Sequence, residues 1–299
     1  MKVLLTGATG QVGLEIIKTQ PESVEIIQPN RNQLNLSDYD SCKKIVKETK
    51  PDWIINCGAY TAVDAAENDI EICTRINSYA PKAFTEAINE TNGKLLQIST
   101  DFVFDGEQNS PYKDNHEKNP LCHYGKSKAL GEELIKNNVN NIKNSIILRT
   151  SWVISPRGRN FILTMLKMHS ERDSINVVSD QIGSPTSAHD LSKVCWKIID
   201  YKTNKLPFIL HWSDAGVASW FDIAVAVGEI AEELKIIRKK AIVNPIYTID
   251  YPTPARRPKY SILDTRNTSN LLGVFPNHWR KNLKNILLEY KTQKLLEFN

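Results

Sequence analysis

The 299-residue sequence predicts an α/β fold with a doubly wound parallel sheet and a smaller, less regular C-terminal lobe. As far as about residue 150, short runs rich in β-branched residues alternate with helix-length amphipathic stretches. This is typical of strands buried on both faces of a parallel sheet. Beyond that point the pattern loosens into separated helices and loops containing proline and glycine. We therefore expect a Rossmann-type domain over 1–150, with parts of the later chain returning to it, and a second lobe formed mainly by 151–299.

Each expected strand is a short apolar run bounded by polar or turn residues, at 2–6, 24–28, 53–57, 94–99 and 145–151. The stretches between them have helical apolar spacing and predict helices over 11–20, 37–50, 69–90 and 123–138. Ser37 or Asp38 can cap the second of these helices. In the second half the expected elements are helices near 160–170, 189–201 and 219–235, a short strand at 208–212, and a last helix after the proline-rich segment 251–258.

Composition excludes several classes of protein. The content of 41% hydrophobic and 24% charged residues is ordinary for a globular chain, and the net charge of +4 is spread without a dense basic block, so we expect no nucleic-acid partner. The five cysteines are odd in number and form no CxxC pair, which fits a reducing compartment. The N-terminal apolar run is too short for a signal peptide and no run of 18 apolar residues occurs, so we expect a cytoplasmic protein without membrane contact.

The first expected strand leads into three glycines spaced three apart, Gly7, Gly10 and Gly13, and then into a helix. Free N–H groups at a helix N-terminus form a natural site for a pyrophosphate, although the GxxGxxG spacing also fits a plain turn. Asn30 and Arg31 stand at the end of the second strand, where dinucleotide-binding folds contact the adenosine ribose. An arginine without an acid there favours NADPH and leaves NADH open, while the alternative is a solvated arginine at a strand end.

Tyr124 and Lys128 are four residues apart at the start of an expected helix, so they share one face. A cation beside a phenol favours the phenolate and makes tyrosine a better acid–base catalyst at neutral pH. The same spacing occurs three more times in the chain, but only Tyr124 follows the fourth strand by a long loop. That strand ends in Thr100 and Asp101, at the edge of the sheet where ligands bind.

Seven motifs occur in an order that resembles the dTDP-4-dehydrorhamnose reductase family of extended short-chain dehydrogenase/reductases, and together they reach from residue 1 to about 264. They are TGATGQVG, NCGAYTAVDAAE, STDFVFDG, YGKSKALGE, LRTSWV, DQIGSPT and ARRPKYSILD. The resemblance implies NAD(P) binding by 1–150 and substrate binding mainly by 151–299. It implies reduction of the C4 carbonyl of dTDP-4-dehydro-L-rhamnose by NAD(P)H, the last step of dTDP-L-rhamnose synthesis for cell-envelope polysaccharide.

The resemblance also implies roles for individual residues. Tyr124 would be the proton donor, Lys128 would bind the nicotinamide ribose and lower the pKa of Tyr124, and Thr100 would hydrogen-bond the reacting oxygen. Asp101 and Trp152 would contact the sugar. The full cofactor-binding set would be Gly7, Gly10, Gln11, Val12, Gly13, Asn30, Arg31, Ala59, Tyr60, Thr61, Tyr124 and Lys128.

Three of these assignments have structural alternatives. Thr100 could be a strand-end hydroxyl that caps a loop, and Trp152 could be core or lid packing. Arg256 and Arg257 lie in a turn bounded by prolines and suit a substrate diphosphate, but exposed arginines are commonly only solvated. Of the two, Arg256 is our candidate for a substrate contact.

A metal site is not predicted, because His123, His189 and His211 lack metal-ligand spacing and are expected to be hydrogen-bonded loop or core histidines. Some members of the family resembled bridge a homodimer through a magnesium ion held by glutamates. Glu15 matches one such position, but no partners for it stand out in the C-terminal half. Magnesium and a homodimer therefore stay open.

Two other functions are compatible with the pattern. A non-catalytic relative, the regulatory subunit of methionine adenosyltransferase, shares much of it and acts by binding a partner. The set of Thr100, Tyr124 and Lys128 favours an enzyme, since a binding module has no physical need for it. A reductase or epimerase acting on another nucleotide-linked deoxysugar is the second alternative, because the residues that select the sugar lie mainly in the loops after residue 150.

Overall fold

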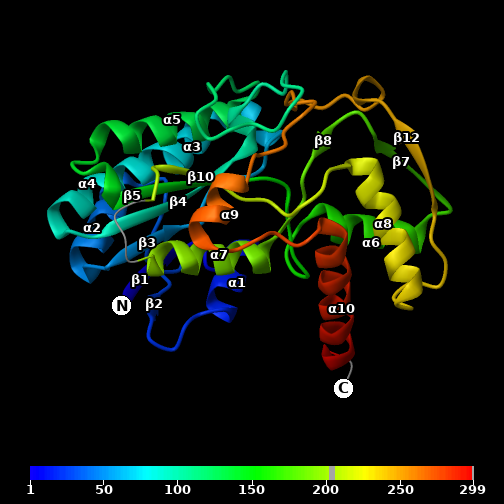
Figure 1. Ribbon diagram of the computed structural model, residues 1–299, viewed down its shortest axis with the longest axis horizontal. Helices are drawn as coiled ribbons and strands as arrows, with labels where there is room; N and C mark the ends of the chain where they lie inside the picture. The colour runs from blue at the N-terminus through cyan, green and yellow to red at the C-terminus, as the bar shows by residue number, and fades with distance from the viewer. Residues whose placement is uncertain (202–205, 298–299) are drawn as a thin grey trace.

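The computed structural model describes residues 1–201 and 206–297, and in these ranges its main feature is a six-stranded parallel sheet (Figure 1). The strand order is β10-β5-β4-β3-β1-β2. The bounds are β1 Lys2–Thr6, β2 Glu25–Ile27, β3 Trp53–Asn56, β4 Lys94–Thr100, β5 Ser145–Thr150 and β10 Ile209–His211. The chain winds from β1 outward in both directions, so the carboxyl ends of all six strands meet at one edge.

Helices cover both faces of this sheet (Figure 1). On one face lie α2 Tyr39–Thr49, α4 Ala80–Thr91 and α5 His123–Asn138, whose apolar residues share a core with the strands. On the other lie α1 Gln11–Lys18, α7 Ala188–Asp200 and α9 Arg266–Leu272. Short turns η1 Ala65–Glu67, η3 Asp101–Val103 and η4 Ile142–Asn144 complete this part. Of the two candidate caps of α2, Asp38 is the one used, since its carboxylate accepts from the Ser41 N–H.

The single helix expected over 69–90 is interrupted. The structure has α3 Ile70–Thr74, then a π-helical turn η2 Arg75–Tyr79, and then α4. The wide turn carries Asn77, whose side chain is buried and hydrogen-bonded to the loop after β3. Such π turns inside helices often occur at functional sites.

The later chain returns to the first sheet. The segment expected as a short strand at 208–212 becomes β10, which extends the main sheet beyond β5 with Leu210 opposite Leu148. Helix α7 packs on α1, and the Trp196 indole N–H donates to the Ile16 carbonyl at 3.2 Å. The edge strand β10 and the covering helix α7 of the first domain thus come from the chain far beyond residue 150.

The second lobe has a separate core around three helices, α6 Phe161–Glu171, α8 Trp220–Glu233 and α10 Trp279–Glu297. In the described ranges its strands form pairs: β6 Val153–Ile154 with β9 Thr186–Ser187, β7 Ser174–Val178 with β12 Ile242–Ile246, and β8 Ile182–Gly183 with β11 Ala218–Ser219. The turn η5 Thr248–Asp250 follows β12. Helix α10 extends away from the body of the molecule (Figure 1).

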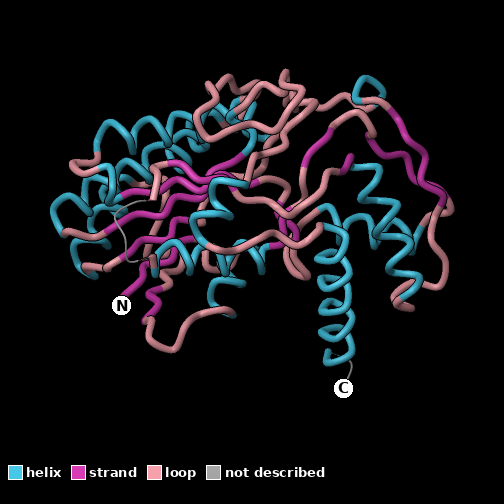
Figure 2. Tube along the Cα trace, in the orientation of Figure 1, coloured by secondary structure: helices cyan, strands magenta, loops and turns pink. Residues whose placement is uncertain are grey.

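Long loops run along the top of the molecule between the two lobes (Figure 2). The loop after β4 and the segment that leads to α9 lie side by side there, with Tyr112 and Leu263 forming a β-bridge. The second segment also bridges to β8 through Tyr260 and Ile182. Within the part of the chain that the structure describes, no helix has the length and apolar character needed to cross a membrane.

Candidate active site

The turn between β1 and α1 requires glycine for steric reasons. Gly7 has a φ of +66°, and a Cβ there would lie 2.7 Å from the backbone nitrogen of Gly58. A Cβ on Gly13 would lie 2.2 Å from the carbonyl oxygen of Gly7, and one on Gly10 would lie 3.2 Å from the same atom. No side chain in the described chain caps the N-terminus of α1, so its first N–H groups are left for an anion. This cradle fits a dinucleotide pyrophosphate.

Gln11 and Val12 face the protein rather than the mouth of the turn. The Gln11 side-chain oxygen accepts from the Ser155 hydroxyl and from the Asn160 amide, both at 2.9 Å. Val12 packs against the core below. Contacts of these two residues with a pyrophosphate are therefore left to their backbone N–H groups, and the Gln11 side chain ties α1 to the segment after β6.

Asn30 and Arg31 are both exposed in the loop after β2. The Asn30 side-chain oxygen accepts from the N–H groups of Asn32 and Gln33 at 3.0 and 3.1 Å, so Asn30 stabilises its own turn. Among the described residues, the Arg31 guanidinium has no hydrogen-bond or ion-pair partner. Arg31 is the one of the two whose charge is free for a ligand.

The segment 59–61 after β3 is held by a residue that sequence reasoning missed. Asn77 accepts from the Tyr60 N–H at 2.8 Å and donates to the Tyr60 carbonyl at 3.0 Å. It also donates to the Ser127 hydroxyl on α5 at 3.0 Å. The Tyr60 hydroxyl donates to Asp69, and this hydrogen bond raises the pKa of Tyr60 to about 12. A polar asparagine inside an otherwise helical apolar pattern was the available signal for Asn77.

Tyr124 and Thr100 meet at the carboxyl edge of the sheet. Gly125 allows this approach, because a Cβ there would lie 2.3 Å from the Phe102 carbonyl oxygen. The Thr100 hydroxyl lies beside the Tyr124 phenol and acts to lower its pKa. Thr100 also accepts from the Phe102 N–H at 3.2 Å and donates to Asp101 at 3.1 Å. Thr100 thus caps a turn, as its structural alternative predicts, and contacts Tyr124 as well.

Lys128 lies one turn along α5, with only 5% of its surface exposed. Its ammonium donates to the Ile98 carbonyl on β4 at 2.7 Å, and burial lowers its pKa to about 8. The pKa of Tyr124 is raised, first by burial and then by the Asp101 carboxylate. This corrects the expectation that Lys128 lowers the pKa of Tyr124: the ammonium is engaged by a backbone carbonyl, and burial outweighs it.

Asp101 is buried beside Thr100, and Ser261, a residue of the ARRPKYSILD motif, lies next to its carboxyl group and acts to lower its pKa. Burial raises the pKa of Asp101 to about 6. Its Oδ2 finds no hydrogen-bond partner in the described part of the chain. Two motifs 160 positions apart, at Asp101 and Ser261, are therefore joined at one point of the site.

The two arginines of the 251–258 segment differ in the structure. Arg257 donates to both carboxylate oxygens of Asp64, at 3.0 and 2.7 Å, and so joins this segment to the loop after β3. Arg256 is exposed, and within the described ranges its guanidinium has no partner. Arg257 is therefore a structural clamp, and Arg256 is the one available to a ligand.

A buried ion pair fixes the helix that carries Tyr124 and Lys128. Glu132 on α5 accepts from Arg149 on β5 at 3.0 and 2.7 Å and from the Ser99 hydroxyl at 2.6 Å. Glu132 is 2% exposed and Arg149 is 1% exposed. Burial alone would raise the pKa of Glu132, but Arg149 holds it below its ordinary value. A charge in a strand that otherwise reads as apolar was the sequence signal for this pair.

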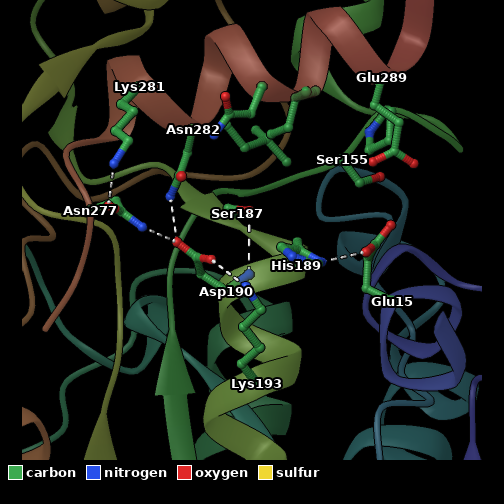
Figure 3. Close-up of a pocket in the computed structure, with 14 residues that line it drawn as sticks. Glu15, Ser155, Ser187, His189, Asp190, Lys193, Asn277, Lys281, Asn282 and Glu289 are labelled. Atoms are coloured by element: carbon green, nitrogen blue, oxygen red, sulfur yellow. Dashed lines mark hydrogen bonds and ion pairs between the residues drawn. The ribbon is translucent and has the colours of Figure 1, made fainter. Parts of the chain in front are cut away.

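Glu15 lies in a pocket of about 210 Å³ between α1, α7 and α10 (Figure 3). Its carboxylate meets the His189 ring at 3.1 Å and the Lys18 ammonium at 3.7 Å, and Lys18 also pairs with Glu289 at 2.7 Å. Within the described chain, no group of three or more histidine, cysteine or acidic side chains is arranged to hold a metal. Both glutamates are paired with the Lys18 ammonium, so the described residues of this one chain form no metal site of their own in this pocket.

The histidines are hydrogen-bonded, as expected. His211 is buried with its Nδ1 at 3.1 Å from the Tyr112 carbonyl, and burial lowers its pKa to about 4. The His123 Nε2 lies 3.1 Å from the Thr74 hydroxyl. Together with His189 on Glu15, all three side chains have protein partners.

A glycine turn into α1, and a threonine beside a Tyr–Lys helix at the carboxyl edge of an open parallel sheet, define a dinucleotide-binding oxidoreductase of the extended short-chain dehydrogenase/reductase type. The family model described as the RmlD substrate binding domain matches residues 1–292. The chain therefore belongs to the RmlD family. This confirms both the resemblance seen in the motifs and the predicted fold class.

Individual relatives span nearly the full chain. The chain is 38% identical over 291 residues to a dTDP-4-dehydrorhamnose reductase of Aggregatibacter actinomycetemcomitans, covering 95% of this chain and 98% of the relative. It is 37% identical to the spore coat polysaccharide biosynthesis protein SpsK of Bacillus subtilis, covering 96% and 97%. A solved dTDP-4-dehydrorhamnose reductase of Bacillus anthracis in complex with NADP is 34% identical with a TM-score of 0.88, covering 96% of this chain and 99% of that one.

Proposed function

We propose that this protein reduces the C4 carbonyl of dTDP-4-dehydro-L-rhamnose to the alcohol of dTDP-L-rhamnose, with NADPH or NADH as reductant. The observation that carries the proposal is the meeting of Thr100, Tyr124 and Lys128 at the sheet edge that also bears the glycine turn. The relatives named as dTDP-4-dehydrorhamnose reductases support the choice of sugar.

The reaction needs a hydride and a proton. When bound, the reduced nicotinamide supplies the hydride, and Tyr124 gives its phenol proton to the oxygen formed at C4. The phenol enters the reaction protonated at neutral pH, since its ordinary pKa of 10 is raised further by burial. Thr100 holds the reacting oxygen beside Tyr124, and Lys128, held by the Ile98 carbonyl, binds the nicotinamide ribose.

Substrate contacts are assigned to Asp101, Trp152 and Arg256. The unpartnered Oδ2 of Asp101 accepts a hydrogen bond from a sugar hydroxyl, and Trp152 packs against the sugar ring. Arg256 binds the diphosphate, since its guanidinium is exposed next to the Asp64–Arg257 clamp.

Arg31 carries the preference for NADPH. Its free guanidinium stands at the end of β2, where a 2′-phosphate lies in dinucleotide-binding folds. Arg31→Ala is expected to lower kcat/KM with NADPH about 10-fold or more and to leave kcat/KM with NADH nearly unchanged. Equal losses with both cofactors would contradict this role.

The test of the function is oxidation of NADPH and of NADH by the purified protein, with and without dTDP-4-dehydro-L-rhamnose made in situ. Oxidation that depends on the sugar is expected. Tyr124→Phe should abolish nearly all turnover and keep the calorimetric affinity for NADPH. A Tyr124→Phe variant that still turns over would overturn the mechanism. Cofactor binding without oxidation by the wild type would move the protein to another sugar or to the regulatory class.

A second sugar is the alternative that one relative favours. The 37% identical SpsK is named for spore coat polysaccharide rather than for rhamnose. A panel of other nucleotide-linked 4-keto-deoxysugars, run in the same assay, distinguishes the two. A higher kcat/KM with any of them than with dTDP-4-dehydro-L-rhamnose would reassign the substrate.

A further inference from the structure

The DQIGSPT motif, residues 180–186, surrounds the backbone and ring of Trp152. A Cβ on Gly183 would lie 2.5 Å from Cε2 of the Trp152 indole, so this glycine leaves room for the ring. The Thr186 N–H donates to the Trp152 carbonyl at 3.1 Å. One residue earlier, the Ser151 hydroxyl donates to the Ser184 carbonyl at 2.6 Å. The motif thus forms a holder for Trp152.

Trp152 needs such a holder because its backbone is strained. Its φ is +45°, in the left-handed region that bulky residues rarely adopt. A residue keeps such a conformation only where its surroundings enforce it, and these positions cluster at functional sites. The contacts from residues 180–186 therefore stabilise a backbone conformation of Trp152 that is unfavourable by itself.

The partner that sets the plane of the Trp152 ring is Trp220, the first residue of α8. The two indoles stack with their centroids 3.7 Å apart and an interplanar angle of 6°. Trp220 is itself fixed: its indole N–H donates to Gln181 at 3.1 Å, and Phe161 packs on it at 4.7 Å. The Trp220 ring thus packs against Trp152 and Phe161, and its N–H is hydrogen-bonded to Gln181.

Trp152 also lies where the reaction would occur. It comes two residues after Thr150, and Thr150 is the register partner of Thr100 on the neighbouring strand. The Trp152 ring therefore connects the second lobe to the sheet edge that carries Thr100 and Tyr124.

We propose that Trp220 and Gly183 are positioning residues that act through Trp152 and hold its indole in the plane that packs against the sugar of the nucleotide-sugar substrate. This rests on the proposed function. Trp220 stabilises the strained conformer by stacking, and Gly183 leaves the space that the ring needs. The second lobe thereby determines how tightly the sugar is held, while the chemistry stays with Tyr124.

The test is a double-mutant cycle on the full-length protein with dTDP-4-dehydro-L-rhamnose. Trp220→Leu and Gly183→Ala should each raise the substrate KM about 3- to 10-fold with a smaller change in kcat and an unchanged NADPH affinity. Trp220→Phe, which keeps a ring, should restore part of the KM. In a Trp152→Ala background, Trp220→Leu should add nothing, because the residue through which it acts is gone. Independent, multiplicative effects on KM in that background would overturn the proposal.

A matched control is Trp53→Phe, at the amino end of β3 and so at the opposite edge of the sheet from the site. It should leave the KM unchanged. If the wild type itself does not oxidise NADPH with this sugar, the proposed function has failed, and near-ultraviolet circular dichroism tests the positioning alone. The two stacked indoles should give a near-ultraviolet circular dichroism band that disappears in both Trp152→Phe and Trp220→Phe. A band that persists in either variant would refute the stacked arrangement.

Discussion

Replacement of Glu132 by Gln is the perturbation whose outcome the structure defines most sharply. The change keeps the shape of the side chain and removes its charge. The Arg149 guanidinium, 1% exposed, then keeps the glutamine oxygen, the Asp114 carbonyl and the His211 ring, the last two at 3.3 Å, and the face of Phe104. None of these carries a negative charge, so a buried cation loses its counter-ion.

Removing one partner of a buried pair costs about 3 to 5 kcal/mol, because the other charge stays desolvated. In a chain of this size, about 2 to 3 °C of Tm correspond to each kcal/mol, so we expect a Tm lower by about 6 to 15 °C. Replacing both partners by apolar residues, Glu132→Leu with Arg149→Met, should recover most of this loss because no charge is left unpaired.

Thermal unfolding at neutral pH measures these effects, with Glu48→Gln as the control. Glu48 pairs with Lys44 at 3.8 Å, and both side chains are more than half exposed, so its loss should cost less than about 0.5 kcal/mol. The pKa of Glu132 is held below its ordinary value of 4.5, so its contribution is present above that pH and is lost as the pH falls. The difference in Tm between the wild type and Glu132→Gln should therefore become smaller at acid pH. A Tm within about 2 °C of wild type at neutral pH would refute the reasoning.

Three further predictions concern other parts of the molecule. Gly13→Ala places a Cβ 2.2 Å from the Gly7 carbonyl oxygen, so the turn must shift, and calorimetry should show NADPH affinity weakened at least about 10-fold. Unchanged affinity would contradict the cradle. Asp214 is buried with its pKa raised to about 7, so its charge destabilises the fold as the pH rises through that value. Asp214→Asn should raise the Tm more at about pH 8.5 than at about pH 5, because the unfolded carboxyl ionises near 3.8 and the cost of keeping it protonated grows until about pH 7. An equal rise in Tm at both pH values would contradict this titration. Asp64→Arg and Arg257→Asp should each raise the substrate KM by loosening the segment 251–258, and the charge-swapped double variant should recover part of the loss. A double variant whose KM rises by the product of the two single-variant factors would contradict the Asp64–Arg257 clamp.

Much of the secondary structure follows from local signals. The helix expected over 123–138 coincides with α5, and one of the two expected caps of α2, Asp38, is the one used. The helix over 69–90 was expected to be continuous, but Asn77 is drawn inward to the loop after β3 and widens one turn. That hydrogen bond joins residues 17 apart and is invisible to helical periodicity.

The candidate site divides in the same way. The glycine turn and the Tyr124–Lys128 spacing are short-range patterns, so they can be read from the sequence. The clamp between Asp64 and Arg257 joins positions 193 apart, and no local sequence pattern around either residue predicts this ion pair. The strained Trp152 has its ring against Trp220 and Gly183, which are likewise far along the chain.

The sequence by itself determined the family and predicted which residues carry the chemistry, because catalytic and phosphate-binding motifs are built from neighbours within a turn or a helix. The tertiary structure alone decided their electrostatics. Lys128 was expected to lower the pKa of Tyr124, but the folded chain buries both groups and gives the ammonium to the Ile98 carbonyl, so the pKa of Tyr124 rises. Burial is a property of everything packed around a group, and no local pattern records it.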